Sequence, residues 1–288
     1  MLASAVVAAP EPAPPNTLPE VSLQKLSERQ VTPLGEAALS IRAADWKHAE
    51  TANFIYHFFS NFVAAPVAAE AEFHYRLTAR DLVKDTAQWE RKCHVFIFET
   101  DAEWAQFQKK GALDPWTGGI HAGGDLFIQR NPQLRWKGST LAHEVAHLVV
   151  HRFFGPGVPL WLDEGYAEYA GTRGHTAFFR ARGYAARPRA EAVDPAHFIS
   201  LAKLTAARAY PTAAEEVAAF YNESERLVRF LSATDKAGFG TFFEALSKGN
   251  RLESALSKGF GTRFKDLAAL EREFRIYATK EYGTAVGD

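Results

Sequence analysis

Apolar residues are spaced differently in the two halves of the chain, and the change falls near Gly138. In the first half, short aromatic and β-branched runs predict strands, because such side chains suit a buried pleated surface. These runs cover residues 53–58, 93–99 and 125–129, and helical periodicity covers residues 64–89 and 101–110. In the second half, the helical spacing of apolar residues predicts helices over residues 139–154, 160–170, 213–231, 239–247 and 264–278. The pattern predicts an α+β fold with a helical C-terminal lobe.

The same change divides the chain into a leader over residues 1–35, an α/β lobe over residues 36–138 and a helical lobe over residues 139–288. Residues 1–9 are small and apolar, like the end of a secretory signal, so we expect a secreted or periplasmic protein. No Lys or Arg precedes Lys25, so these residues are either the tail of a signal that begins upstream or a remnant of cloning. Five prolines from Pro10 to Pro19 then predict an extended segment that does not pack, because proline lacks an amide donor.

Charge and cysteine content exclude several classes of function. The chain has 33 Lys and Arg against 34 Asp and Glu, so it offers no positive field to nucleic acid or to an acidic membrane, and we expect no nucleic-acid partner. No apolar run approaches the roughly 18 residues of a membrane-spanning helix, so no stable membrane insertion is expected. Cys93 is the only cysteine and is expected to be a buried small hydrophobe. Any protein-bound metal must therefore use His and carboxylate ligands.

The segment with the clearest chemistry is His143-Glu144-Val145-Ala146-His147, inside a predicted helix. Residues four apart lie about 40° apart around a helix and one turn along it, so both imidazoles leave the same face. The two nitrogens can then bind one metal ion. Glu144 is rotated by about 100° from His143, which places its carboxylate beside the ion, as suits a base that activates water.

His151 continues the four-residue spacing and could pair with His147 instead. Along the helix axis His143 and His151 are about 12 Å apart, so one ion cannot bind all three histidines through bonds of about 2 Å. A pair formed by His147 and His151 would also have Leu148 at the position of the base. We interpret His151 as a core residue or as a residue that contacts a ligand.

A catalytic zinc ion has three protein ligands and one open position, so a third ligand is needed. Residues 155–159 (Gly-Pro-Gly-Val-Pro) end the first helix, and the next helix carries acidic residues on one stripe. Glu164 is the expected third ligand. Glu168 lies one turn further on the same face, where it can accept the free ring N–H of a ligating histidine. Gly165 has no side chain and is expected to let this helix approach the first one closely.

Together these residues resemble the gluzincin metallopeptidases, and in particular the peptidase MA-like family of bacterial proteins. The resemblance is carried by the His143–His147 motif and by residues 161–169 (Trp-Leu-Asp-Glu-Gly-Tyr-Ala-Glu-Tyr). It extends to residues 220–231, which are similar to that family's Tyr-x-x-Ser helix, and more weakly to residues 239–277. What the resemblance implies is a zincin-like fold, with a small twisted sheet over an active-site helix and Zn²⁺ held by two histidines and a glutamate.

The resemblance also implies a donor for the oxyanion that forms during peptide hydrolysis. Some gluzincins use a tyrosine as this donor, and the resemblance to them implies Tyr221 for the role, with Tyr210 as the alternative. The glycine-rich residues 118–122 are either an edge strand that pairs with an extended substrate or a plain loop. They lack the acidic residue with which aminopeptidase N relatives hold a free amine, which makes that type of exopeptidase less favoured.

The function expected from the sequence is zinc-dependent hydrolysis of internal bonds in a peptide or protein substrate. In this interpretation His143, His147 and Glu164 bind Zn²⁺, Glu144 and Tyr221 act on the reacting atoms, and Glu168 contacts a ligating histidine. Two alternatives remain open at this stage. One is a zinc-binding module of the same fold with weak or no catalysis, and the other is a zinc amidase that acts on cell-wall peptide.

Overall fold

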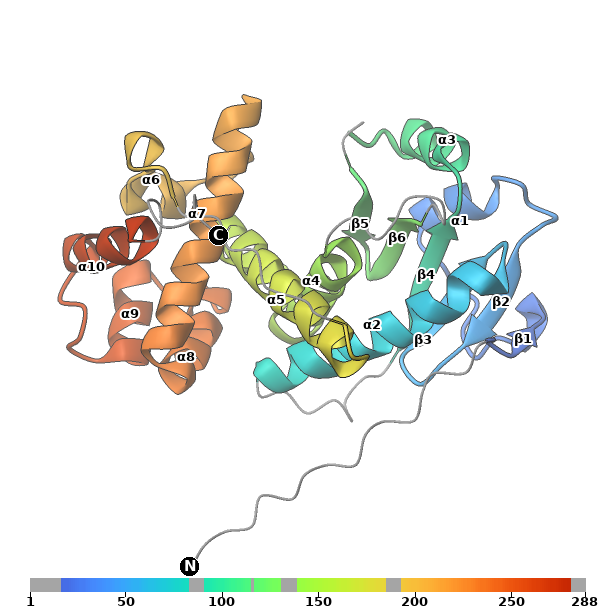
Figure 1. The fold of residues 1–288 in the computed structure, drawn as a ribbon, viewed down its shortest axis with the longest axis horizontal. Coiled ribbons are helices and arrows are strands. Elements are labelled where there is room, and N and C mark those ends of the chain that lie inside the picture. The colour runs from blue at the N-terminus through green and yellow to red at the C-terminus, as the bar shows by residue number, and fades with distance from the viewer. Residues whose placement is uncertain (1–16, 83–90, 115–116, 131–138, 185–192, 281–288) are drawn as a thin grey trace, which may run out of the picture.

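A computed structural model describes residues 17–82, 91–114, 117–130, 139–184 and 193–280. Strands lie in the N-terminal part of this range, and the C-terminal part is helical (Figure 1). The α+β class predicted from the sequence is confirmed. No described helix combines the length and the apolar character that a bilayer span requires.

The strands form one mixed sheet in the order β1-β2-β3-β4-β6-β5. Parallel pairing joins β3 to β4 and β4 to β6, and the other pairs are antiparallel. The six strands are β1 (Glu20–Val21), β2 (Lys47–Glu50), β3 (Phe54–Phe58), β4 (Cys93–Phe98), β5 (Gly119–Ala122) and β6 (Asp125–Gln129). The three strands that the sequence predicted are the central ones. These are buried along their whole length, except for the last residue of β6, which explains their continuous apolar pattern.

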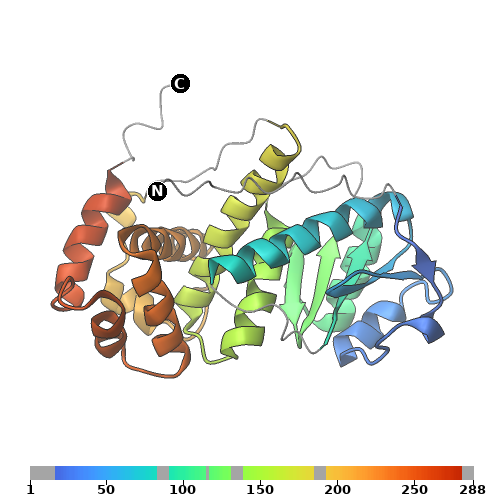
Figure 2. The same ribbon diagram turned by 90° about the horizontal axis from the view of Figure 1, so that it is seen from below.

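Alternate residues of each central strand face different layers. From β4, Val95 and Ile97 pack with helices α2 (Asn61–Asp81) and α4 (Thr140–Phe154), and α2 crosses the sheet in Figure 2. Phe96 and Phe98 point to the opposite face, where they pack with α1 (Pro33–Leu39) and α3 (Asp101–Gly111). Cys93 is buried, as expected. The sheet therefore lies between two helical layers, and α4 belongs to one of them.

The helical region continues from α4 through α5 (Leu160–Ala181), which contacts both α4 and α7 (Ala214–Thr234). In Figure 1, α4 and α5 lie between the sheet and the remaining helices. Those are α6 (Leu201–Ala206), α8 (Lys236–Ser247), α9 (Leu252–Phe260) and α10 (Leu267–Thr279). The predicted helix over residues 160–170 is thus one end of a longer element. The second half of α5 packs against α2, where Gly174 lies against His74.

Part of the expected leader is built into the fold. Strand β1 pairs with β2 through Glu20 and Val21, and Leu18 and Leu26 are buried. Helix α1 then begins at Pro33, capped by the side chain of Thr32. Residues 17–35 therefore contribute to the sheet and its covering layer, although the sequence analysis assigned them to a leader. The signal-like residues 1–9 lie outside the described residues.

Three histidines form a row across neighbouring strands on the α1 and α3 face of the sheet. Nδ1 of His48 lies 2.8 Å from Nδ1 of His57, and Nε2 of His57 lies 2.8 Å from Nδ1 of His94. All three side chains are buried. Burial lowers the pKa of His48 and His57, and it lowers the pKa of His94 to about 4. The row is therefore neutral at neutral pH, and each pair shares one proton.

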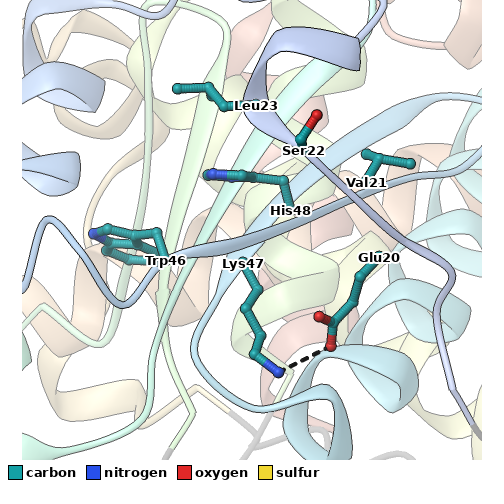
Figure 3. Close-up of a pocket in the computed structure, with 7 residues that line it drawn as sticks. All are labelled: Glu20, Val21, Ser22, Leu23, Trp46, Lys47 and His48. Atoms are coloured by element: carbon teal, nitrogen blue, oxygen red, sulfur yellow. Dashed lines mark hydrogen bonds and ion pairs between the residues drawn. The ribbon is translucent and has the colours of Figure 1, made fainter.

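The outer end of this row reaches a surface pocket beside β1. His48 lines this pocket together with residues 20–23, Trp46 and Lys47 (Figure 3). Nζ of Lys47 lies 3.1 Å from Oε1 of Glu20, so the charged groups of the pocket are paired with each other. The pocket lies next to the first two strands of the sheet, at the end opposite to β5.

The buried row predicts acid sensitivity of the fold. A folded-state pKa of about 4 for His94, below the value of 6.5 for an exposed histidine, means that the unfolded chain binds more protons between these two pH values. The contribution of neutral His94 to the free energy of unfolding is thus fully present above pH 6.5 and is lost as the pH falls towards 4. We expect the free energy of unfolding to decrease by about 2 kcal/mol between pH 7 and pH 5 through His94 alone. Urea denaturation at the two pH values measures it.

A matched pair of variants isolates this effect. His94→Leu should reduce the difference between pH 7 and pH 5, whereas His197→Leu, at an exposed histidine outside the sheet, should leave it unchanged. The quantity compared is the change in the free energy of unfolding between pH 7 and pH 5 within each variant. A general loss of stability in His94→Leu therefore does not affect the comparison. Equal pH dependence of both variants would contradict the assignment.

Candidate metal centre

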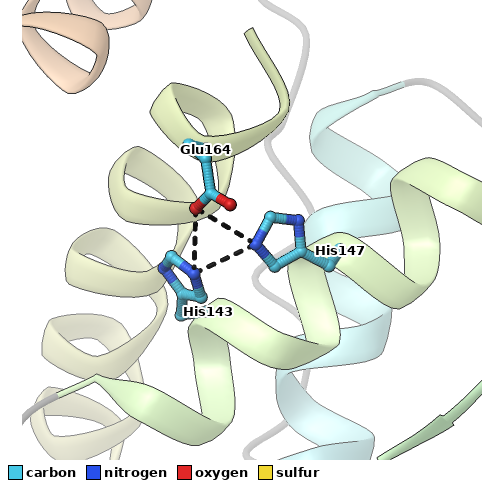
Figure 4. Close-up of side chains that lie close together, drawn as sticks. All are labelled: His143, His147 and Glu164. Carbon is cyan, nitrogen blue, oxygen red and sulfur yellow. Dashed lines mark hydrogen bonds and ion pairs between the residues drawn. The ribbon is translucent and has the colours of Figure 1, made fainter. Parts of the chain in front are cut away.

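The site begins with the turn that brings two helices together. Helix α4 ends at Phe154, and Gly155 follows with a φ of 76°, a conformation that favours glycine. Helix α5 starts after Pro159, and Glu164 lies in its second turn. This reversal places Glu164 opposite His143 and His147, which leave one face of α4 (Figure 4). The three predicted ligands therefore come together in space.

Their ligand atoms form a small triangle. Nε2 of His143 lies 3.0 Å from Nε2 of His147, and Oε2 of Glu164 lies 3.5 Å and 3.4 Å from these two nitrogens. Zinc bonds of about 2.0–2.1 Å at tetrahedral angles separate ligand atoms by about 3.3 Å. Oε2 of Glu164 is buried and has no hydrogen-bond partner of good geometry in the described part of the chain. The three side chains thus fit a single metal ion, and they form one of the two groups among the described residues that could hold one.

The outer nitrogen of each imidazole faces a carboxylate. Nδ1 of His143 lies 3.1 Å from Oε1 of Glu168, the contact expected from the sequence. Nδ1 of His147 lies 3.0 Å from Oδ1 of Asp163, and Oδ2 of Asp163 lies 2.7 Å from Nε2 of His151. Such partners fix the orientation of the ring and keep Nε2 free to bind a metal. Both imidazoles are therefore oriented so that their Nε2 atoms face the same candidate metal position.

The role of Asp163 was missed in the sequence analysis. Glu164 was predicted as the third ligand and Glu168 as the contact of a ligating histidine, and no role was predicted for Asp163. Two signals could have pointed to Asp163: it precedes the ligand directly, and His151 lies one helical turn beyond His147. The structure connects them, because Asp163 lies close to both rings. His151 was interpreted as a core residue or as a residue that contacts a ligand, and the structure places its ring against Asp163, which in turn contacts the predicted ligand His147.

The charges of this cluster are strongly coupled. Burial by itself lowers the pKa of His143 and His147, but the neighbouring carboxylates outweigh it and raise that of His143 to about 9. Burial likewise raises the pKa of Asp163, but the two histidines outweigh it and bring it down to about 2. The pKa of Glu164 is lowered for the same reason. A divalent cation in the triangle supplies the positive charge that the two imidazolium protons otherwise provide.

Glu144 lies beside this triangle under the edge strand β5. It is buried, and burial raises the pKa of its carboxyl group, opposed by the two histidines. A methyl group built on Gly119 of β5 would lie 2.7 Å from Cγ2 of Thr140 and 3.1 Å from Cγ of Glu144. The glycine-rich segment is therefore an edge strand, one of its two interpretations, and glycine lets its backbone contact the start of α4.

Glycines also set the packing of α5, but not as expected. A Cβ at Gly165 would collide with the carbonyl oxygen of Ser224, so this glycine allows α5 to approach α7. The close approach to α4 occurs at Gly171, where a Cβ would lie 3.3 Å from the backbone nitrogen of His143. The expectation that Gly165 admits α4 is thus corrected. The two glycines lie on different faces of α5, because six residues rotate by about 600° and so leave the two positions about 120° apart around the helix.

Two tyrosines reach the site from α7 and the segment before it. The hydroxyl of Tyr210 donates a hydrogen bond to Oε1 of Glu164, the oxygen that faces away from the imidazoles. The ring of Tyr221 stacks on that of Tyr210 at a centroid distance of 6.1 Å. Burial and the charge of Glu164 raise the pKa of both phenols, so both remain hydrogen-bond donors at neutral pH. Tyr210 therefore holds the carboxylate of Glu164, whereas the ring of Tyr221 lies behind that of Tyr210.

A model of the peptidase MA superfamily matches residues 79–280. The chain belongs to the peptidase MA superfamily. The match spans α4, α5 and α7 and thus every residue of the triangle, so the resemblance carried by the sequence motifs is confirmed. No curated protein matches the sequence significantly.

In this peptidase MA protein the contact of Tyr210 with Glu164 predicts a role in metal binding. Tyr210→Phe removes the hydroxyl and leaves the ring, so Glu164 becomes freer to rotate. We expect about a 10-fold lower affinity for zinc, measured by competition with a chromophoric chelator. Tyr221→Phe is the matched control and should change the affinity little. Equal affinities of Tyr210→Phe and the unaltered protein would contradict the role.

Proposed function

We propose that this protein is a zinc-dependent metallopeptidase that cleaves internal peptide bonds. The observation that carries the proposal is the triangle of Nε2, Nε2 and Oε2 atoms from His143, His147 and Glu164, with the carboxyl group of Glu144 beside it. Membership of the peptidase MA superfamily supports the same conclusion. Two imidazoles and one carboxylate leave a fourth tetrahedral position for water or substrate, as catalytic zinc sites require.

Zinc is proposed as the metal because it favours nitrogen and carboxylate ligands in a tetrahedral arrangement. Zinc bound here would polarise the scissile carbonyl and make water acidic enough to act near neutral pH. Asp163 and Glu168 hold the rings of His147 and His143, and Tyr210 holds the remaining oxygen of Glu164. The chain therefore restrains the orientation of each proposed ligand by a separate contact.

Glu144 is proposed as the base. Its carboxylate accepts a proton from the attacking water and then returns that proton to the amine nitrogen as the peptide bond breaks. Burial raises its pKa, which brings the carboxyl group closer to neutral pH and suits a group that both takes and gives a proton. The carboxylate of Glu144 makes no ion pair with Lys or Arg among the residues the structure describes, so it stays available for this exchange.

The free side of β5 is proposed to bind the substrate backbone. This strand ends the sheet, so one row of its amide and carbonyl groups faces away from β6, and the amide of His121 in this strand donates a hydrogen bond to the carboxylate of Glu144. An extended peptide could pair with this row above Glu144, because Gly119 keeps the strand close to α4. Tyr221 is proposed as the donor to the oxyanion, since Tyr210 is occupied by Glu164. A secreted or periplasmic location is also proposed, on the basis of residues 1–9 alone.

Glu144→Gln tests the proposed base. Glutamine keeps the shape of the side chain and cannot accept the proton, so we expect kcat to fall by about 10²- to 10⁴-fold with one equivalent of zinc retained. Peptide-library cleavage followed by mass spectrometry measures activity, and elemental analysis measures zinc. Glu253→Gln, at an exposed residue of α9, is the matched control.

The outcomes of this experiment separate the rival functions. A protein that binds zinc but cleaves neither peptides nor cell-wall fragments would be a binding module. Cleavage of cell-wall peptide without cleavage of the library would indicate an amidase. Unchanged turnover in Glu144→Gln would rule out the proposed base.

Tyr221→Phe tests the proposed oxyanion donor. Loss of a hydrogen bond that forms only in the transition state should lower kcat by about 10²-fold, with KM and zinc content unchanged. Steady-state kinetics on a peptide found in the library measures both constants. Full turnover with intact zinc would exclude Tyr221 from this role.

A further inference from the structure

A second group of potential metal ligands adjoins the first. It consists of His147, His151 and Asp163, whose ligand atoms lie within 4.8 Å of one another. The two groups share His147, but they lie on different sides of its ring. Nε2 of His147 faces Glu164 at 3.4 Å, and Nδ1 faces Asp163 at 3.0 Å. The second group is thus built around the other ring nitrogen.

The donor set and spacing of this group suit the same class of metal ion. The carboxylate of Asp163 lies between two imidazoles, with Oδ2 at 2.7 Å from Nε2 of His151. Two nitrogens and a carboxylate are the ligands that zinc prefers, as in the first group. The side chain of His151 is 36% exposed, whereas that of Glu164 is 5% exposed. The second group is therefore reachable from solvent and is the less enclosed of the two.

The charge of the whole cluster favours more than one cation. Four carboxylates gather here, from Glu144, Asp163, Glu164 and Glu168. Within the described residues, the ion pairs formed by three of them are with histidines and not with Lys or Arg, and none is formed by Glu144. One divalent ion in the first group leaves two negative charges when all four acids are ionised. Buried or half-buried charge without a partner is costly, so a further cation is stabilised there.

We propose that His151, Asp163 and Nδ1 of His147 bind a second divalent cation, and that this ion inhibits the enzyme. This inference rests on the proposed function, because inhibition presupposes a catalytic ion in the first group. Binding displaces the proton of Nδ1 to solvent and turns the oxygens of Asp163 towards the new ion. His147 then loses the carboxylate that orients it, which weakens its hold on the first ion.

The proposal predicts two classes of zinc binding. Equilibrium dialysis of the full chain against increasing free Zn²⁺, read by elemental analysis, should give a tight equivalent followed by a weaker one. Filling of the weaker class should reduce peptide cleavage by about 10-fold or more. His151→Phe should lose the weaker equivalent and the inhibition while it keeps the tight equivalent. Phenylalanine retains a ring of similar size, so the packing of α4 is preserved.

The control is another histidine that contacts an aspartate. Nδ1 of His197 lies 2.8 Å from Oδ2 of Asp194 on an exposed surface, and among the described residues this pair belongs to no group of three potential metal ligands. His197→Phe should bind two equivalents of zinc, like the unaltered protein. Identical zinc-binding curves for the unaltered protein and His151→Phe would overturn the proposal.

The first group is tested separately by Glu164→Ala. If the tight equivalent is lost in Glu164→Ala and kept in His151→Phe, it occupies the first group. If the tight equivalent is instead kept in Glu164→Ala and lost in His151→Phe, the tightly bound ion occupies the second group, and the proposed function fails. Two zinc classes without any peptide cleavage would support the second site and contradict its role as an inhibitor. These outcomes keep the two proposals distinguishable.

Discussion

The structure depends on the placement of an ionised carboxylate, that of Glu164, against two imidazoles in a buried setting. Removing a carboxylate from water is costly unless positive charge or hydrogen bonds replace the solvent. Here the replacement comes from His143 and His147, or from a cation that takes the place of their protons. The same electrostatic requirement explains why each histidine has a carboxylate behind it and why Tyr210 donates to the far oxygen of Glu164.

Such convergence needs two helices at a fixed separation, and glycines provide it. Gly171 allows the backbone of α4 to approach one face of α5 closely, and Gly165 allows the backbone of α7 to approach a different face. Because α5 is held on both sides, the position of Glu164 is set by backbone packing and not by a flexible side chain. The edge strand β5 completes the arrangement from the sheet, since Gly119 brings its backbone over Thr140 and Glu144. A site built from rigid elements is well suited to a reaction that needs close positioning.

The histidines of this chain serve two opposite electrostatic purposes. Near the site, acidic neighbours raise the pKa of His143, whereas in the sheet burial outweighs the opposing charge of Glu50 and lowers the pKa of His94 to about 4. Both sets are buried, so the difference lies in the neighbours and not in the depth. The sequence offers no way to tell them apart by composition. His94 stands in an apolar strand, and His143 and His147 stand in an equally apolar helix.

The sequence by itself was enough to predict the candidate ligand set, because the spacing of His143 and His147 on one helical turn is a local property, and Glu164 follows in the next amphipathic helix. It also determined the three central strands and the helical second half, whose patterns arise from burial on regular elements. Tertiary structure alone decided what depends on distant segments. Strand β1 pairs with residues far along the chain, α5 runs beyond the predicted helix, Gly165 faces α7, and Asp163 joins His147 to His151. These contacts depend on which faces of the helices and strands pack together. The periodicity of a single segment shows which of its faces is buried, but it does not show which other segment packs against that face.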